Sequence, residues 1–202
     1  MELTDDLIKA AKAAFKMPTA MKITGRTSSI TNAFGNGIIP CVTPTPEQIL
    51  HALQLLNMDP FDVRCVYCGD KATEWDHFHP LIRNKEPSGY ISEIHNLVPC
   101  CSKCNQSKGN KQWKLWMKGN AKLSPKTRNI PNLDARIKIL ENYENECTCT
   151  ILHFKHIPEI SEDWKQYWKN HDDLLGQMRT YQELADKIQV ALLKHYNSLN
   201  KK

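Results

Sequence analysis

Four cysteines occur as two C-x-x-C pairs near the middle of the 202-residue chain. Cys65 and Cys68 form the first pair and Cys101 and Cys104 the second, with 32 residues between the pairs. Two-residue spacing lets neighbouring thiolates converge on one ion, and two pairs complete the tetrahedral four-sulfur shell of structural zinc. We therefore predict a structural Zn²⁺ site, with buried free thiols or a redox pair as the alternatives. Such a site has no open coordination position, so any chemistry must come from other residues.

The remaining cysteines lack this spacing. Cys100 adjoins the second pair but breaks its pattern, Cys147 and Cys149 flank a single threonine, and Cys41 is isolated. We leave Cys100 out of the zinc site and expect the other three to be packing residues.

Acidic, imidazole and amide side chains lie between and just after the cysteine pairs. Residues 74–81 read E-W-D-H-F-H-P-L, which predicts a strand with Asp76 and His77 on opposite faces. A loop containing glycine and a second short apolar strand at 96–99 follow. The second cysteine pair then opens a helix that runs through Asn105 and the two tryptophans beyond it. The predicted order is strand, strand, helix, with zinc at the base.

These motifs, in this order, resemble the HNH endonucleases, the ββα-metal nucleases. The resemblance covers residues 64–117 and is carried by C-V-Y-C-G at 65–69, W-D-H-F-H-P-L at 75–81, H-N-L-V-P at 95–99 and C-S-K-C-N-Q-S-K-G-N-K at 101–111. It implies an α+β fold class, in which a zinc-bound ββα-metal core is embedded in mainly α-helical N- and C-terminal extensions.

The resemblance also implies roles for four polar residues. His77 would be the general base, Asp76 and Asn105 would be ligands of one divalent ion, and Asn96 would hold the loop that orients His77. An unperturbed imidazole, with a pKa of about 6.5, suits a base near neutral pH. One carboxylate and one amide oxygen suit Mg²⁺ or Mn²⁺, so we expect one of these ions as the catalytic cofactor. For His79, assistance at the phosphate and simple packing both stay open, and packing is favoured.

Positive charge is concentrated just after the first motifs. The chain has 27 Lys and Arg against 22 Asp and Glu, a net charge of +5, yet residues 95–132 contain no acidic residue. The basic residues of this segment are Lys103, Lys108, Lys111, Lys114, Lys118, Lys122, Lys126 and Arg128. The segment therefore carries +8 and the remainder of the chain −3. A solvated helix face is the alternative, but such faces usually mix signs, so we predict a surface that follows phosphates, with Lys108, Lys111 and Lys114 as nucleic-acid contacts.

The N-terminal part is predicted to be a helical extension, residues 1–60, with a long irregular segment. Residues 3–15 have the apolar periodicity of an amphipathic helix, and a second helix begins at Thr45-Pro46 with a capping box and ends near Asn57. Residues 17–44 lose the periodicity and are rich in Thr, Ser, Asn, Gly and Pro, which predicts a mostly irregular segment.

The nuclease core is predicted at 61–120 and a helical C-terminal region at 121–202. One helix follows Pro131, another begins at Ser161, and a last helix carries a heptad-like apolar stripe from Leu174 to Leu192. An ordinary helix packed on the core is favoured for that stripe, and a homodimeric coiled coil is the alternative.

Composition and the N-terminal sequence limit the classes to which the protein can belong. With 41% apolar and 24% charged residues, the chain is globular and neither disordered nor fibrous. The acidic start lacks the apolar stretch of a signal peptide, and no apolar run reaches the roughly 18 to 20 residues of a membrane span, so a cytoplasmic protein without a membrane partner is expected.

The leading functional hypothesis is a metal-dependent endonuclease that hydrolyses phosphodiester bonds in DNA, expected to be duplex, in restriction or phage defence. The alternatives are a non-catalytic zinc module that binds nucleic acid, a nicking or homing HNH nuclease, and a nuclease that acts on RNA or single strands. Asp76, His77 and Asn105 together favour the enzyme, because a binding module has no need of all three.

Overall fold

The computed structural model describes residues 3–199, which divide into two compact units. One unit is Ser28–His171, and the other joins the two ends of the chain, Met1–Thr27 and Asp172–Lys202. The residues with predicted roles at the metal ions or in nucleic-acid binding all lie within Ser28–His171. The finer division of the chain at residues 60 and 120 stays a prediction.

Two short antiparallel sheets form the centre of the larger unit. Strand β1 (Glu74–His77) pairs with β4 (Leu97–Cys100), with Asp76 opposite Val98 and His77 opposite Leu97. Strands β2 (Ile82–Arg83) and β3 (Glu86–Pro87) form a hairpin. The two residues between them, Asn84 and Lys85, have φ of 51° and 69°, the left-handed backbone that a tight two-residue hairpin needs.

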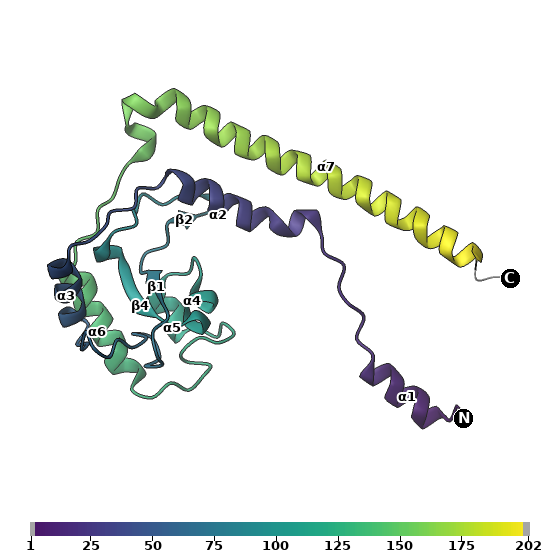
Figure 1. Ribbon diagram of the computed structural model, residues 1–202, viewed down its shortest axis with the longest axis horizontal. Helices are drawn as coiled ribbons and strands as arrows, with labels where there is room; N and C mark the ends of the chain where they lie inside the picture. Colours follow the sequence, from purple (N-terminus) through teal and green to yellow (C-terminus); the bar gives the residue numbers. More distant parts are fainter. Residues whose placement is uncertain (1–2, 200–202) are drawn as a thin grey trace. The chain divides into compact units, whose positions relative to one another are not determined.

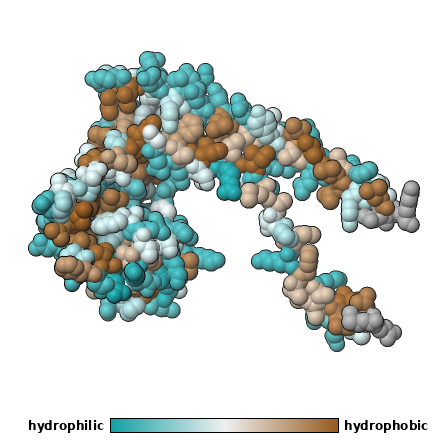
Figure 2. Space-filling view, viewed as in Figure 1, coloured by the Kyte–Doolittle hydropathy of each residue, from teal (hydrophilic) through white to brown (hydrophobic). Residues whose placement is uncertain are grey.

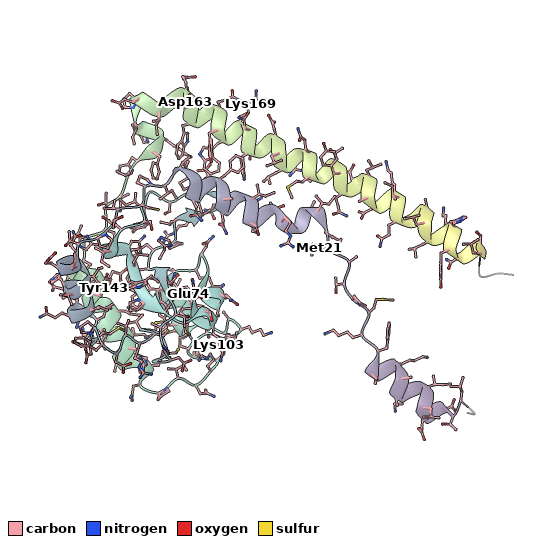
Figure 3. The ribbon with its side chains drawn as sticks, in the orientation of Figure 1. Met21, Glu74, Lys103, Tyr143, Asp163 and Lys169 are labelled. Atoms are coloured by element: carbon pink, nitrogen blue, oxygen red, sulfur yellow. The ribbon has the colours of Figure 1, made fainter. Side chains whose placement is uncertain are left out.

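Four helices pack around β1 and β4 (Figure 1). They are α3 (Pro46–Leu55), α4 (Ser102–Lys108), α5 (Trp113–Lys118) and α6 (Leu133–Glu146). The core beneath them is aromatic, because Trp113 stacks on Phe78 with ring centroids 5.0 Å apart, and both rings are buried. Tyr143 of α6 donates its hydroxyl to the carbonyls of Ile94 and Leu97, which ties α6 to the short helix η2 (Ile94–Asn96) and to β4 (Figure 3).

The single helix predicted beyond the second cysteine pair is interrupted. Helix α4 ends at Lys108, and α5 begins only at Trp113. Gly109 has a φ of 49°, a left-handed conformation that ends a right-handed helix and that glycine adopts without a steric penalty. The break lets α5 turn both tryptophans, Trp113 and Trp116, into the core.

The segment predicted to be irregular at 17–44 contains helix α2 (Thr27–Ile38), preceded by a 3₁₀ turn, η1 (Ile23–Arg26). The prediction is therefore wrong for residues 27–38. Serine, threonine, asparagine and glycine are weak helix formers, so the local sequence did not reveal the helix. Contacts from elsewhere hold it, since Thr31 bonds to His171 and the Phe34 ring packs against Tyr167. Helix α1 (Asp5–Ala14) and the capping box of α3 agree with the prediction.

From Ser161 onward the described residues form one helix where two were predicted. Two 3₁₀ turns, η3 (Phe154–His156) and η4 (Pro158–Ile160), lead into α7 (Ser161–Leu199), which continues for 39 residues. It contains no proline and only one glycine, Gly176, which costs about 1 kcal/mol and does not end a helix. Large apolar side chains are exposed along its later part (Figure 2). Within residues 3–199 no helix is both long enough and apolar enough to cross a lipid bilayer.

Candidate metal centres and active site

The two cysteine pairs meet in a buried cluster. The Sγ atoms of Cys65, Cys68, Cys101 and Cys104 all lie within 4.8 Å of one another, and those of Cys68 and Cys101 are 3.6 Å apart. A tetrahedral site with Zn–S bonds of about 2.3 Å places its sulfurs about 3.8 Å apart. The cluster therefore fits a zinc ion, and it excludes Cys100, although that residue is buried next to Cys101.

Local backbone geometry and one arginine shape this cluster. The Gly69 N–H donates to the carbonyl of Cys65, and Gly69 has a φ of 83°, so the chain turns tightly around the first pair. Arg128 places Nη1 3.3 Å from Cys104 Sγ and Nη2 3.0 Å from Asp70 Oδ2. A guanidinium beside the sulfurs favours their thiolate form, which is the form that binds metal.

A separate pocket brings together three of the residues with predicted roles. Asp76 and His77 at the end of β1 and Asn105 in α4 all line it. The rest of its wall comes from the loop after β1 and the start of β2, from the turn after α4, and from Asn32 and Asn36 of α2. Because α2, β1 and α4 are distant in the sequence, the tertiary fold assembles the pocket.

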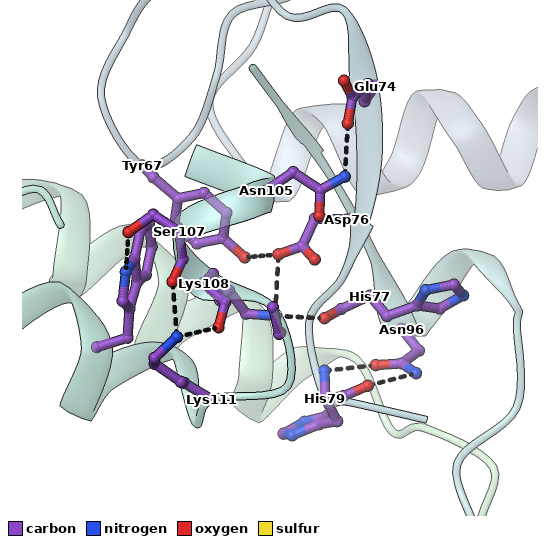
Figure 4. Close-up of polar contacts among 12 residues, drawn as sticks. Tyr67, Glu74, Asp76, His77, His79, Asn96, Asn105, Ser107, Lys108 and Lys111 are labelled. Carbon is purple, nitrogen blue, oxygen red and sulfur yellow. Dashed lines mark hydrogen bonds and ion pairs between the residues drawn. The ribbon is translucent and has the colours of Figure 1, made fainter. Parts of the chain in front are cut away.

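Asp76 is buried but has two partners for one of its oxygens. The Tyr67 hydroxyl donates to Oδ2 at 2.7 Å, and the Lys108 ammonium lies 3.0 Å from the same atom (Figure 4). Burial raises the pKa of Asp76, and the charge of Lys108 and these hydrogen bonds oppose that rise. Neither contact uses Oδ1, which leaves that oxygen available to a cation.

Lys108 does not lie where a phosphate contact was predicted. Its side chain is fully buried, and Nζ bonds Asp76 and, at 2.7 Å, the carbonyl oxygen of His77. A buried carboxylate needs a nearby opposite charge, and Lys108 is one helical turn beyond Asn105, on the side of α4 that faces β1. Its position makes it a partner of Asp76, and the prediction that it contacts nucleic acid is contradicted.

His77 is held by a side chain that sequence reasoning missed. Its Nε2 lies 2.9 Å from Oγ of Ser92, a residue in the segment before β4. Burial, with the nearby charge of Lys108, lowers the pKa of His77 to about 4. The imidazole is therefore neutral at pH 7, as a group that accepts a proton must be.

Asn105 is oriented by a second residue that sequence reasoning missed. Its Nδ2 donates to Oε2 of Glu74 at 2.5 Å, and Figure 4 shows the amide oxygen on the side of Asp76. The alternation of a strand could have identified this acid, because Glu74 and Asp76 are two residues apart and share a face of β1. Two oxygen donors, Oδ1 of Asp76 and Oδ1 of Asn105, are thus left for a hard cation.

Asn96 lies outside the pocket and bonds the backbone on two sides. Its Oδ1 accepts the N–H of His79 at 2.7 Å, while its Nδ2 donates to the carbonyls of His79 and Ile91, both at 3.1 Å. The side chain therefore ties the loop after β1 to the segment before η2. The His79 ring stacks on Tyr90 with centroids 4.5 Å apart, and its Nε2 lies 3.6 Å from Glu144.

In the folded protein, acidic side chains pair with three of the eight basic residues of the segment 95–132. Lys114 pairs with Glu141 at 2.5 Å and Arg128 with Asp70 at 3.0 Å, in addition to the pair of Lys108 and Asp76. Lys111 is exposed and donates to the carbonyls of Ser107 and Lys108. Among residues 3–199, the members of this segment without an acidic partner are Lys103, Lys111, Lys118, Lys122 and Lys126.

Comparison with known proteins relates the middle of the chain to one family and to one curated protein. Residues 65–111 match the family model described as HNH endonuclease. Over 62 residues the chain is 37% identical to a CRISPR-associated endonuclease Cas9 of Corynebacterium diphtheriae. The aligned region covers 29% of this chain and 5% of that protein. The chain thus corresponds to a small part of that relative. No solved structure matches the chain.

The family match includes both metal-binding candidates. Residues 65–111 contain all four clustered cysteines together with Asp76, His77, Asn96 and Asn105. Helix α2, which closes the pocket with Asn32 and Asn36, lies outside the matched residues.

Proposed function

We propose that this protein is a metal-dependent endonuclease that hydrolyses phosphodiester bonds in DNA. The observation that carries the proposal is the shared pocket of Asp76, His77 and Asn105, a base and two oxygen donors brought together from β1 and α4. The match of residues 65–111 to the HNH endonuclease family supports it.

In this proposal His77 removes a proton from the attacking water. The hydrogen bond to Ser92 occupies Nε2, so the tautomer with its proton on Nε2 leaves the Nδ1 lone pair as the base. The lowered pKa keeps that lone pair free at neutral pH. Asn96 supports this arrangement indirectly, because it holds the loop that leaves β1 just after His77.

Asp76 and Asn105 would hold one Mg²⁺ or Mn²⁺ ion through their Oδ1 atoms. One carboxylate and one amide leave most coordination positions for water and phosphate oxygens, which suits these hard ions. When bound, the ion supplies positive charge at the scissile phosphate and at the leaving oxygen. Glu74 and Tyr67 keep the two ligands in place through their hydrogen bonds.

Zn²⁺ in the four-cysteine cluster would have a structural role. It would join the turn before β1 to the start of α4, and α4 carries Asn105. A site with four thiolate ligands has no position for a substrate, so the zinc would stabilise the pocket without entering it.

Duplex DNA is the substrate we propose, with Lys111 as an exposed contact and Lys114 as a contact already shared with Glu141. The five lysines without acidic partners supply the charge that phosphates require. We place the enzyme in the cytoplasm, where a reducing environment preserves thiolate ligands, and in restriction or phage defence. A second copy of this chain is a further proposed partner, through α7.

Plasmid cleavage in Mg²⁺ tests the proposal. Wild-type protein is expected to cut, while His77→Ala and protein treated with a chelator are not. His51→Ala serves as the matched control, since His51 is exposed on α3 and lies outside the pocket. Failure of the wild type to cut supercoiled, linear or modified duplex DNA would overturn the endonuclease. Cutting of RNA or single strands in place of duplex DNA would correct the substrate.

A further inference from the structure

Helix α2 contributes two amide side chains to the catalytic pocket. Asn32 and Asn36 are four residues apart, so they lie on one face of the helix, and both line the pocket with Asp76, His77 and Asn105. Neither side-chain amide has a hydrogen-bond partner among residues 3–199, although Asn32 is half-buried. The amides are thus available to a molecule that enters the pocket.

Contacts on the other faces of α2 fix the orientation of the helix. Gly35 lies so close to β2 that a Cβ atom there would be 2.0 Å from Cδ1 of Ile82. On another side, Thr31 Oγ1 lies 2.9 Å from His171 Nε2, and the Phe34 ring is 5.1 Å from that of Tyr167. These contacts hold the helix against rotation, so the face with the two asparagines is held toward the catalytic residues.

The volume of the pocket and the absence of acidic residues from α2 limit the kind of ligand that can bind there. The pocket has a volume of about 160 Å³, below the roughly 300 to 1,000 Å³ of small-molecule sites. A single phosphate of a polymer fits such an opening better than a whole small molecule does. Helix α2 has no acidic residue that would repel a phosphate, and an asparagine amide can donate to phosphate oxygens.

We propose that α2 is a substrate-binding element in which Asn32 and Asn36 donate hydrogen bonds to the backbone phosphate of the DNA strand that enters the pocket. This inference rests on the proposed endonuclease function. It extends the substrate surface beyond the matched residues 65–111 to a helix that is a separate part of the chain. Because phosphates are the same at every position, the contacts would add affinity without sequence preference.

Steady-state cleavage by Asn32→Ala and Asn36→Ala tests the inference. Each variant loses one hydrogen bond to a charged group, so KM should rise about 10- to 150-fold with kcat changed less than twofold. Asn36→Asp keeps the size of the side chain but repels phosphate, so its KM should rise further at low salt. Because salt screens that repulsion, the difference in KM between Asn36→Asp and Asn36→Ala should shrink as salt rises. Asn142→Ala, at an exposed asparagine of α6 outside the pocket, should match the wild type.

A binding measurement separates this inference from the proposed function. In a His77→Ala background, fluorescence anisotropy with a labelled duplex oligonucleotide should show Kd weakened by the same factors, and circular dichroism should show an unchanged fold. Unchanged KM and Kd would overturn the inference. A rise in kcat would also overturn it, because it would show that the asparagines restrict access to the catalytic residues. A loss of DNA affinity seen only with particular DNA sequences would also overturn the inference, because it would indicate contacts to bases. If wild type does not cut but the asparagine variants weaken DNA binding, the endonuclease fails and the binding surface stands.

Discussion

At the scale of single residues, Lys108 and Asp76 form the most tightly constrained pair near the pocket. Both side chains are almost completely buried, and their charged atoms are 3.0 Å apart. Burial lowers the pKa of Lys108, and the carboxylate of Asp76 opposes that change, so each group supports the charged form of the other. An oxygen ligand can therefore stay ionised in an interior that would otherwise neutralise it.

Replacement of Lys108 by methionine should destabilise the protein strongly. The variant retains an apolar side chain of similar length but leaves the Asp76 carboxylate without its cation, which typically costs about 3–5 kcal/mol. Urea unfolding without Mg²⁺ measures the change, and Lys103→Met, at an exposed position of the same helix, should stay within about 0.5 kcal/mol of wild type. A loss below about 1 kcal/mol for Lys108→Met would contradict this account of the pair.

The pH dependence of cleavage should report the lowered pKa of His77. A base acts in its neutral form, so activity is lost as pH falls through the pKa, which is about 4 here. At pH 5 such a group is about 90% neutral, whereas an ordinary imidazole with a pKa of about 6.5 is only about 3% neutral. We expect kcat/KM to change less than twofold between pH 7 and pH 5.

The control for this profile is the zinc content and circular dichroism of the same samples at both pH values. A drop of about 25-fold between pH 7 and pH 5, in protein that keeps its zinc and fold, would show an unperturbed histidine.

At the scale of elements, the cysteine cluster connects two parts of the pocket. It links the turn at Cys65 and Cys68, which precedes β1, to the first residues of α4. Strand β1 carries Asp76 and His77, and α4 carries Asn105. The separation of the two proposed ion ligands thus depends on how the cluster is held, although the cluster itself lies outside the pocket.

Metal analysis should find one zinc ion per chain, and Cys104→Ala should lose it. Without one of four thiolates the tetrahedral shell is incomplete, and the folding free energy that the ion supplies is lost. Cys100→Ala is a close control because Cys100 is buried beside the cluster but does not belong to it. Elemental analysis and thermal unfolding provide the measurements. Full zinc content in Cys104→Ala would rule out the four-sulfur site.

At the scale of the whole molecule, α7 carries a row of exposed apolar side chains. Tyr181, Ile188 and Leu192 are each more than half exposed, although they follow the steps of three and four that form a stripe on a helix. Exposed stripes of this kind mark interaction surfaces in soluble proteins.

Sedimentation should show a dimer for the wild type and a monomer for the double variant Ile188→Glu, Leu192→Glu. Two charges in the stripe would have to be desolvated in the interface, which outweighs the gain from apolar contact. Gln189→Glu adds a charge at an exposed neighbouring position of α7 and should leave the dimer intact. A wild-type monomer at micromolar concentration would remove α7 as a dimer interface.

Local spacing in the sequence was sufficient for some of these features. The two C-x-x-C pairs predicted the cysteine cluster because two-residue spacing by itself brings paired thiolates together. The strands that contain Asp76 and Leu97 and the capped helix at Thr45 were likewise predictable, since their signals lie within a few residues of one another. The whole α+β organisation, with helical flanks, followed from such local signals and the resemblance.

Only the tertiary structure determined which partners the charged and amide side chains contact. The segment around Lys108 contains no acidic residue and so predicts a phosphate contact, but the ion-pair partner of Lys108 is Asp76, in a strand 32 residues earlier. The weak helix formers of residues 27–38 predict an irregular segment, but packing against β2 and the start of α7 stabilises helix α2 there, and α2 forms one wall of the pocket. Local sequence determines which residues can form a turn, a ligand pair or a helix, whereas burial and ion pairing depend on distant residues that only the folded chain brings together.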